Sequence, residues 1–158
     1  MYSDDDYDNL VHYDYNDLED KEKIPSKCKK FVCVYNNVDK LPKLPKYLVI
    51  LHCESNNLTT LPELPDLLEI LSCSNNILIC IPKLPLLLGY LTCNNNNLTE
   101  LPELPERIDT LECMYNNIKY LSLHNINIIK MMDPDFIELL HNPFSNGFET
   151  MEDFLANI

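Results

Sequence analysis

The stretch Leu91–Pro105, LTCNNNNLTELPELP, decides the fold because related phrases occur four more times along the chain. Taken alone, its four consecutive asparagines suggest a low-complexity loop. The cysteine within the stretch, however, belongs to a series with an invariant spacing of twenty residues, which comprises Cys33, Cys53, Cys73, Cys93 and Cys113. A fixed period of this length is typical of repeat proteins. The 158-residue chain is therefore predicted to be a stack of repeated units.

Each unit begins five residues before its cysteine and reads LxxLxCxxNxLxxLPxLPxx, with positions counted from its first residue. Position nine is asparagine in all five units, at Asn36, Asn56, Asn76, Asn96 and Asn116. The five units span residues 28–127. A degenerate sixth unit in the same phase is expected at residues 8–27, where the pattern is matched by Val11, Tyr13, Asn16, Leu18, Ile24 and Pro25. Downstream, the register ends after Leu121, because Ser122 and Asn125 replace the prolines.

The pattern predicts a solenoid with one parallel β-sheet. Side chains at positions four and six lie two apart, so in a strand both point to the same face and fill a narrow core. The asparagine at position nine turns the chain, and its amide can satisfy backbone groups of its own and the adjacent repeat. The LPxLP return cannot be helical, because each proline lacks a donor and favours extended geometry in the preceding residue. Extended, polyproline-like segments are therefore expected behind the sheet.

This phrase resembles the leucine-rich repeat family, and its twenty-residue LPxLP unit is most similar to the repeats of bacterial effectors of the YopM and IpaH type. Cysteine at position six and the asparagine-rich filling also resemble leucine-rich repeat proteins encoded by giant DNA viruses of amoebae. The resemblance implies an α/β-class leucine-rich repeat solenoid with its sheet on the concave face and short capping helices. In the IpaH type, ubiquitin-ligase catalysis belongs to a separate C-terminal domain with a Cys-x-Asp motif. No Cys-x-Asp occurs in this sequence, so no enzymatic activity is expected.

The two ends are expected to cap the stack, because a unit this short cannot bury its apolar edge alone. Residues 1–27 form an acidic N-terminal segment that includes the degenerate repeat, and residues 128–158 a C-terminal helical cap. Asp133-Pro134 is a strong helix start, and the apolar face of that helix would be Phe136, Ile137, Leu139 and Leu140. Thr150 is expected to cap a second helix that turns Met151, Phe154 and Leu155 inward.

Charge and hydropathy exclude several partner classes. The net charge is -13, and there is no basic stripe that could neutralise phosphates, so neither nucleic acid nor an anionic membrane surface is an expected partner. The sequence shows no secretory signal and no apolar run of membrane-spanning length. A cytoplasmic protein is predicted, located in the host cytoplasm if it is viral or an effector.

The cysteines and histidines give little support to a metal site or to a cofactor. There is no close cysteine pair and no Cys/His cluster, so zinc is not expected. Disulfides between stacked neighbours are sterically conceivable, but the preferred interpretation is that the cysteines at position six are small apolar core residues. Cys80 is expected to be the accessible thiol. His12 and His52 are assigned to the same repeat position, the fifth, and are expected to point outward.

The first residues carry a run of aspartates with interleaved tyrosines. A solvated lead-in is favoured over a calcium site, because the spaced ligand loop is missing at Asp4, Asp5, Asp6 and Asp8. A partner-binding arm or a phosphorylation target remains an alternative for Tyr2, Tyr7, Tyr13 and Tyr15.

The outward positions three, five, seven and eight should form one continuous surface, where an apolar stripe of Ile50, Ile70 and Tyr90 runs between polar neighbours. Apolar groups within a polar rim are typical of a protein-binding patch, although β-favouring residues that merely suit a sheet are the alternative. The function predicted is a non-enzymatic protein-interaction module that binds a partner on the concave face of the repeat sheet. Its predicted partner-binding residues are Ile50, His52, Ile70, Ser72, Tyr90, Thr92, Glu112 and Tyr115. The second hypothesis is a substrate-receptor or adaptor subunit of the ubiquitin-pathway kind, which recruits other machinery through its C-terminal segment.

Overall fold

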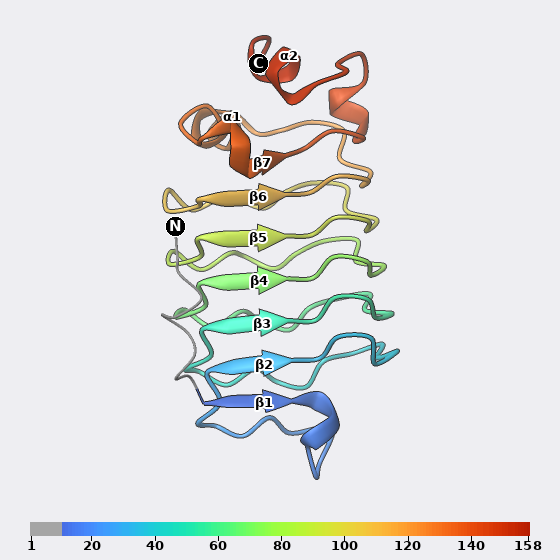
Figure 1. Cartoon of the computed structure of the whole chain (residues 1–158), viewed down its shortest axis with the longest axis vertical. Coiled ribbons are helices and arrows are strands. Elements are labelled where there is room, and N and C mark those ends of the chain that lie inside the picture. Colours follow the sequence, from blue (N-terminus) through green and yellow to red (C-terminus); the bar gives the residue numbers. More distant parts are fainter. Residues whose placement is uncertain (1–10) are drawn as a thin grey trace.

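The computed structural model describes residues 11–158. The chain winds as a solenoid, and one strand from each turn contributes to a single parallel sheet (Figure 1). Seven short strands follow one another in chain order, and they are β1 (His12–Asp14), β2 (Lys30–Val32), β3 (Ile50–His52), β4 (Ile70–Ser72), β5 (Tyr90–Thr92), β6 (Thr110–Glu112) and β7 (Ile137–Glu138). The expectations for the aspartate run and for Tyr2 and Tyr7 concern residues outside the described range. The predicted parallel-sheet solenoid is confirmed.

The core of the central rungs is a column of leucines backed by a column of cysteines. Leu51, Leu71 and Leu91 are register partners on successive strands, and all three are fully buried. The cysteines two residues further on are buried to the same extent. Each fully buried leucine contributes about 1.5–3 kcal/mol relative to an exposed one, so the stacking of units stabilises what a single unit cannot.

The LPxLP returns run behind the sheet without any helix in the described repeats, as their prolines predict. Their leucines point inward and join the core, with exposed fractions of 1–8%. At the end of each return, the backbone N–H of the residue at position one donates a hydrogen bond to the carbonyl oxygen of the second proline of the phrase. Leu68 N is 3.0 Å from Pro65 O, and Leu88 N is 3.1 Å from Pro85 O. This turn starts the next repeat at a fixed place.

The first rung is present but in a different phase from the one predicted. Tyr13 pairs with Phe31, which lies 18 residues later rather than 20, so Tyr13 takes position four, where the sequence suggested Val11. Val11 is 41% exposed, whereas Tyr13 and Tyr15 pack against the core. Because side chains alternate between the two faces of a strand, a shift of two residues leaves each side chain on the same face. Tyr13 and Tyr15 can therefore occupy the two inward positions that the sequence assigned to Val11 and Tyr13.

The same shift overturns the assignment of His12 and His52 to one repeat position. His12 pairs with Lys30, which is at position three, and it is Asp14 that aligns with Val32 and His52 at position five.

The last rung lies beyond the point where the sequence register ends. Ile137 of β7 pairs with Leu111 of β6, 26 residues earlier, so the unit carries an insertion of six residues. Leu139 and Asn142 then occupy positions six and nine of this longer repeat, and both are at most 1% exposed. The phrase IxLxxNxF, residues 137–144, therefore completes the sheet.

The inserted residues form helix α1 (Leu123–Ile129), which the sequence did not suggest. The hydroxyl of Ser122 caps it by accepting a hydrogen bond from Asn125 N at 3.1 Å. The side chain of Asn125 accepts from Leu104 N at 2.9 Å and donates to Pro102 O at 3.0 Å. The two residues that replace the prolines thus begin a helix and fix it to the preceding LPxLP return.

The prediction of a helix that begins after Asp133 is wrong, although Asp133 does act as an N-cap. Asp133 caps a single 3-10 turn, Pro134–Phe136, and the chain then enters β7. Phe136 is 37% exposed, while Ile137 and Leu139 are buried. Burial at alternate residues is the period of a strand, and pairing with β6 therefore overrides the helix signal.

The second predicted helix is present as α2 (Met151–Leu155), capped by the side chain of Thr150, and Phe154 in it is 2% exposed. The ring of Phe154 lies 5.5 Å from those of Phe144 and Phe148, which ties the helix to the last rung. Within residues 11–158 neither helix is long and apolar enough to cross a membrane.

Candidate functional site

A broad cleft of about 1570 Å³ lies on the outer face of the sheet, the face that carries positions three and five. One wall is the sheet itself, from Lys30 on β2 to Glu112 on β6. The other wall is the end of α1 and the α1–β7 connection, residues 130–136, which contributes Met131, Met132 and Phe136. Figure 1 shows α1 and β7 at one end of the sheet, beside β6. We call this space the sheet cleft.

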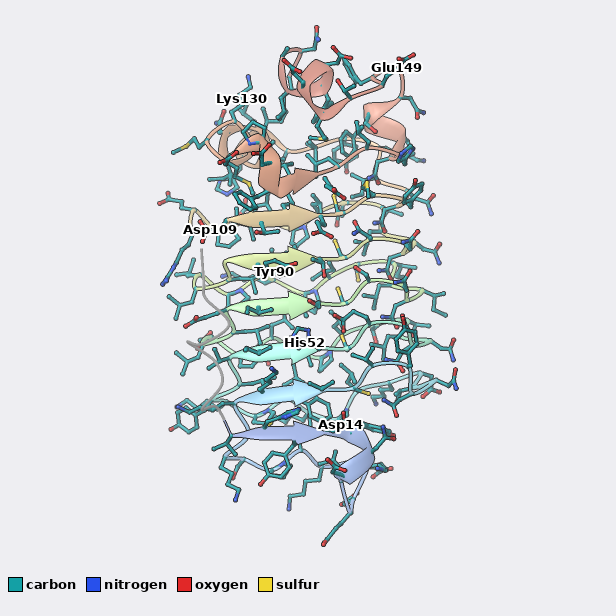
Figure 2. All side chains as sticks on the ribbon, in the orientation of Figure 1. Asp14, His52, Tyr90, Asp109, Lys130 and Glu149 are labelled. Carbon is teal, nitrogen blue, oxygen red and sulfur yellow. The ribbon has the colours of Figure 1, made fainter. Side chains whose placement is uncertain are left out.

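Seven of the eight residues predicted to bind a partner line the sheet cleft, and these are Ile50, His52, Ile70, Ser72, Tyr90, Thr92 and Glu112. His52 and Tyr90 are labelled on their strands in Figure 2. The eighth, Tyr115, is not among the lining residues. Its ring stacks on that of His141, with ring centroids 4.4 Å apart and planes 3° from parallel. The structure thus brings seven of the residues together and separates one.

Not all of the seven are accessible, which corrects the expected stripe of exposed anchors. Ile50 is only 2% exposed, and Ser72 and Thr92 are 4% and 8% exposed. Strands in a sheet lie about 4.8 Å apart, so side chains on adjacent rungs can cover one another. Ile70 and Tyr90 remain partly exposed. Among the seven, these two residues therefore provide the accessible apolar contact area.

The second wall was missed by sequence reasoning because the twenty-residue register does not extend to it. Met131 is 84% exposed and Phe136 is 37% exposed, so both side chains are free to contact a ligand. Methionine is flexible and polarisable, and it is common on surfaces that accept varied partners. The signal available in the sequence was the Met131-Met132 pair directly after an apolar helix, but only the insertion places it opposite the sheet.

Carboxylates dominate the charge of the sheet cleft. Its described lining contains five of them, against Lys30 as the one Lys or Arg side chain, and they are Glu54, Glu106, Asp109, Glu112 and Asp133. Burial, followed by the nearby charges of Glu112 and Glu54, raises the pKa of the Tyr90 phenol. Both carboxylates therefore act on the middle of the sheet wall, one from the end of β3 and one from β6.

Glu54 is incompletely satisfied. Its Oε1 lies 3.3 Å from Nδ1 of His52. Its Oε2 is enclosed and, among the described residues, is the one buried side-chain nitrogen or oxygen without a hydrogen-bond partner. By contrast, Glu112 Oε2 accepts a hydrogen bond from Asn94 Nδ2 at 2.9 Å. An enclosed, unpaired carboxylate oxygen is costly. The Glu54 side chain as a whole is 25% exposed, so a partner can reach the carboxylate group from the sheet cleft although Oε2 itself is covered.

The position-nine asparagines hold successive rungs, and with them the sheet wall, in register. Asn76 Oδ1 accepts a hydrogen bond from Leu58 N at 3.0 Å, and its Nδ2 donates to the carbonyls of Cys53 and Cys73 at 3.0 and 3.1 Å. The same pattern recurs at Asn56, Asn96, Asn116 and Asn142. Asn36, one rung earlier, donates to Val34 O in its own loop.

Position eight has a left-handed backbone in six successive rungs, with φ between 53° and 62° at Tyr35, Ser55, Asn75, Asn95, Tyr115 and His141. Asparagine tolerates this conformation, whereas tyrosine and serine adopt it at a cost. The left-handed conformation of this turn is therefore determined by packing between rungs and not by the conformational preference of the residue at position eight.

Comparison with solved structures agrees with this architecture. YopM from Yersinia enterocolitica is 32% identical with a TM-score of 0.64, and the match covers 74% of this chain and 24% of that one. A leucine-rich repeat domain of a Shigella effector is 29% identical with a TM-score of 0.67, and the match covers 74% of this chain and 55% of that one. The chain is a leucine-rich repeat protein. It spans about a quarter of the length of YopM and about half of the Shigella domain. No protein-family model and no curated protein matches its sequence.

The thiols of this leucine-rich repeat protein are placed for packing rather than for nucleophilic chemistry. Burial raises the pKa of Cys28 to about 11 and, with the charge of Asp14, that of Cys33 to about 12. The pKa values of Cys53 and Cys73 are also raised well above the ordinary range, chiefly by burial. Cys80 is exposed, as expected. In the described part of the chain, no three His, Cys, Asp or Glu side chains form a group that could hold a metal ion.

Proposed function

We propose that this leucine-rich repeat protein is a non-enzymatic interaction module that binds a protein partner in the sheet cleft. The observation that carries the proposal is the opposition of two partly exposed apolar surfaces. Ile70 and Tyr90 lie on the sheet wall, and Met131 and Phe136 lie on the wall made by the α1–β7 connection. Apolar area enclosed by a polar rim, with a methionine-rich side, is the usual composition of a protein-binding site.

Rigid support favours the same proposal. The backbone directly after β3, β4 and β5 is held by the asparagine bonds described above. The α1–β7 connection lies between two elements with core residues, Ile129 and Ile137. A partner can therefore bind between walls that are already ordered, so little conformational entropy is lost on binding. A cytoplasmic location is part of the proposal.

The adaptor hypothesis is a different proposal, in which the C-terminal segment recruits other machinery. In the structure, Ile129, Ile137, Leu139 and Phe154 belong to the same core cluster as the repeats. Recruitment would therefore have to use the surface of this segment, since the segment is not packed as a separate unit.

The test of the proposed function is capture of a partner from lysate of the native host by Ile70→Asp and by Ile79→Asp variants. Ile79 is 58% exposed and is not among the residues that line the sheet cleft, so it is a matched control for the same substitution. Ile70→Asp and Tyr90→Ala are expected to abolish capture while the melting temperature falls by no more than a few degrees. Capture retained by Ile70→Asp, or lost equally in Ile79→Asp, would place the partner elsewhere.

A further inference from the structure

The charge of the sheet cleft limits the chemistry of its occupant. The described lining contains five carboxylates and, as the one Lys or Arg side chain, Lys30, and His52 is already within 3.3 Å of Glu54. An acidic partner would bring like charges into a partly enclosed space, where they repel strongly. A basic partner would offset that charge and would approach faster, because the whole chain carries a net charge of -13.

The shape of the sheet cleft limits the form of the occupant. The sheet wall runs across the strands from β2 to β6, which is four strand spacings, or about 19 Å at about 4.8 Å each. Roughly six residues of extended chain span that length at about 3.3 Å per residue. A short extended segment can therefore lie along the whole wall.

Along that path, two apolar side chains lie between two carboxylates. Glu54 follows β3 and Glu112 ends β6, while Ile70 and Tyr90 lie on the two strands between them. Tyr90 also presents a ring that can contact a cation, and such contacts are strongest when water is partly excluded. The Glu54 side chain is 25% exposed and its Oε2 has no hydrogen-bond partner, so the carboxylate is not fully neutralised by its surroundings.

We propose that the occupant is an extended, positively charged protein segment whose Lys or Arg side chains face Glu54 and Glu112, and whose apolar side chains contact Ile70 and the α1–β7 connection. This inference rests on the proposed function, because it assigns a chemistry to the partner of the same site. The neutral and the acidic segment are the alternatives that the experiment distinguishes.

The probe is a displayed library of short random peptides, selected on the full chain and counter-selected on the Ile70→Asp variant, so that only cleft-dependent peptides survive. These peptides are expected to be enriched in Lys and Arg. Their affinity is then compared in two double variants with the same change in net charge. Glu54→Gln with Glu112→Gln removes charge from the sheet cleft, and Glu63→Gln with Glu103→Gln removes it from exposed return segments outside the cleft.

The cleft variant is expected to weaken binding by roughly tenfold or more, and the control variant by about twofold or less. Equal weakening in both would show that only the overall charge attracts the peptides, and the inference would be overturned. Cleft-dependent peptides without basic residues, insensitive to Glu54→Gln with Glu112→Gln, would also overturn it but would leave the proposed function intact. If no peptide depends on Ile70 but capture of the native partner does, the inference is overturned and the proposed function stands; if capture is also independent of Ile70, the proposed function fails as well.

Discussion

The central repeats and the two ends of this protein build the same rungs by different rules. From β2 to β6, each register partner lies twenty residues from the next, and the unit repeats almost without change. At the first rung the interval is 18 residues, and at the last it is 26. Both end rungs nevertheless retain the strand and its inward pair of side chains. The last rung also retains the asparagine at position nine, Asn142, whose side chain bonds the preceding rung. The local phrase, rather than the period, therefore determines whether a rung forms.

The ends also differ from the centre in what they add. The longer interval before β7 supplies α1 and the α1–β7 connection, which form the second wall of the sheet cleft. A stack of identical twenty-residue units would present only the sheet face. The irregular repeat thus adds a second wall to the face of the sheet.

The largest expected effect compares the cores of a central and a terminal rung. Leu91 and Leu139 are both fully buried and occupy inward positions on their rungs. Leu91→Ala and Leu139→Ala are each expected to cost about 2–5 kcal/mol in the free energy of unfolding. Urea unfolding followed by circular dichroism measures both. A cost near zero for Leu139→Ala, or a separate early transition in the wild type, would mean that the last rung is not part of the cooperative stack.

The next effect compares two rungs of the asparagine ladder. Asn96→Ala and Asn142→Ala each leave buried backbone groups without partners, and each is expected to destabilise the protein by about 1–3 kcal/mol. Asn97→Ala is the control, because Asn97 is exposed, and it should be nearly silent. Thermal unfolding of the three variants decides the matter. If Asn142→Ala behaves like Asn97→Ala, the asparagine bonds between the last two rungs do not contribute to stability.

A smaller effect tests the 18-residue phase of the first rung. Tyr13→Ala is expected to cost about 1–2 kcal/mol, because a partly buried ring leaves the core. Val11→Asp should change stability by less than about 0.5 kcal/mol, because that side chain is exposed. The twenty-residue phase makes the opposite forecast, with Val11 as the core residue. Urea midpoints of the two variants therefore discriminate between the phases.

The smallest effect concerns the left-handed residue at position eight. Ser55→Gly is expected to stabilise the protein by about 0.5–1 kcal/mol, since glycine adopts the positive φ of 56° without a steric cost. Asn75→Gly should gain less, because asparagine already tolerates this conformation. A loss of stability in Ser55→Gly, measured by the melting temperature, would show that chain entropy outweighs backbone strain at this turn.

Much of the fold could be predicted from the sequence because the need for two apolar, inward-facing side chains in each strand recurs every twenty residues. The alternation around Cys53, Cys73 and Cys93 indicated the strands, and the prolines indicated the non-helical returns. The ends could not be placed by period, because the length of an insertion is not encoded in the repeat. A search for the phrase alone would have found Ile137, Leu139 and Asn142.

The candidate site was predictable only in part. Alternation along the strands identifies which residues face outward, so Ile70, Tyr90 and Glu112 were found. Exposure depends on how side chains on adjacent rungs pack against one another, which alternation along one strand does not encode, so the burial of Ile50 was missed. The α1–β7 connection was missed because its position depends on tertiary packing of α1 rather than on any local pattern.

The most direct test of the central claim is a methyl NMR titration with the tightest cleft-selected peptide. If the sheet and the α1–β7 connection form one site, the methyl signals of Ile70, Met131 and Met132 should shift together, with the same dissociation constant. The methyl signal of Ile79, outside the sheet cleft, should remain unchanged. A titration that shifts Ile70 but neither methionine, or that shifts Ile79 as strongly, would contradict the account.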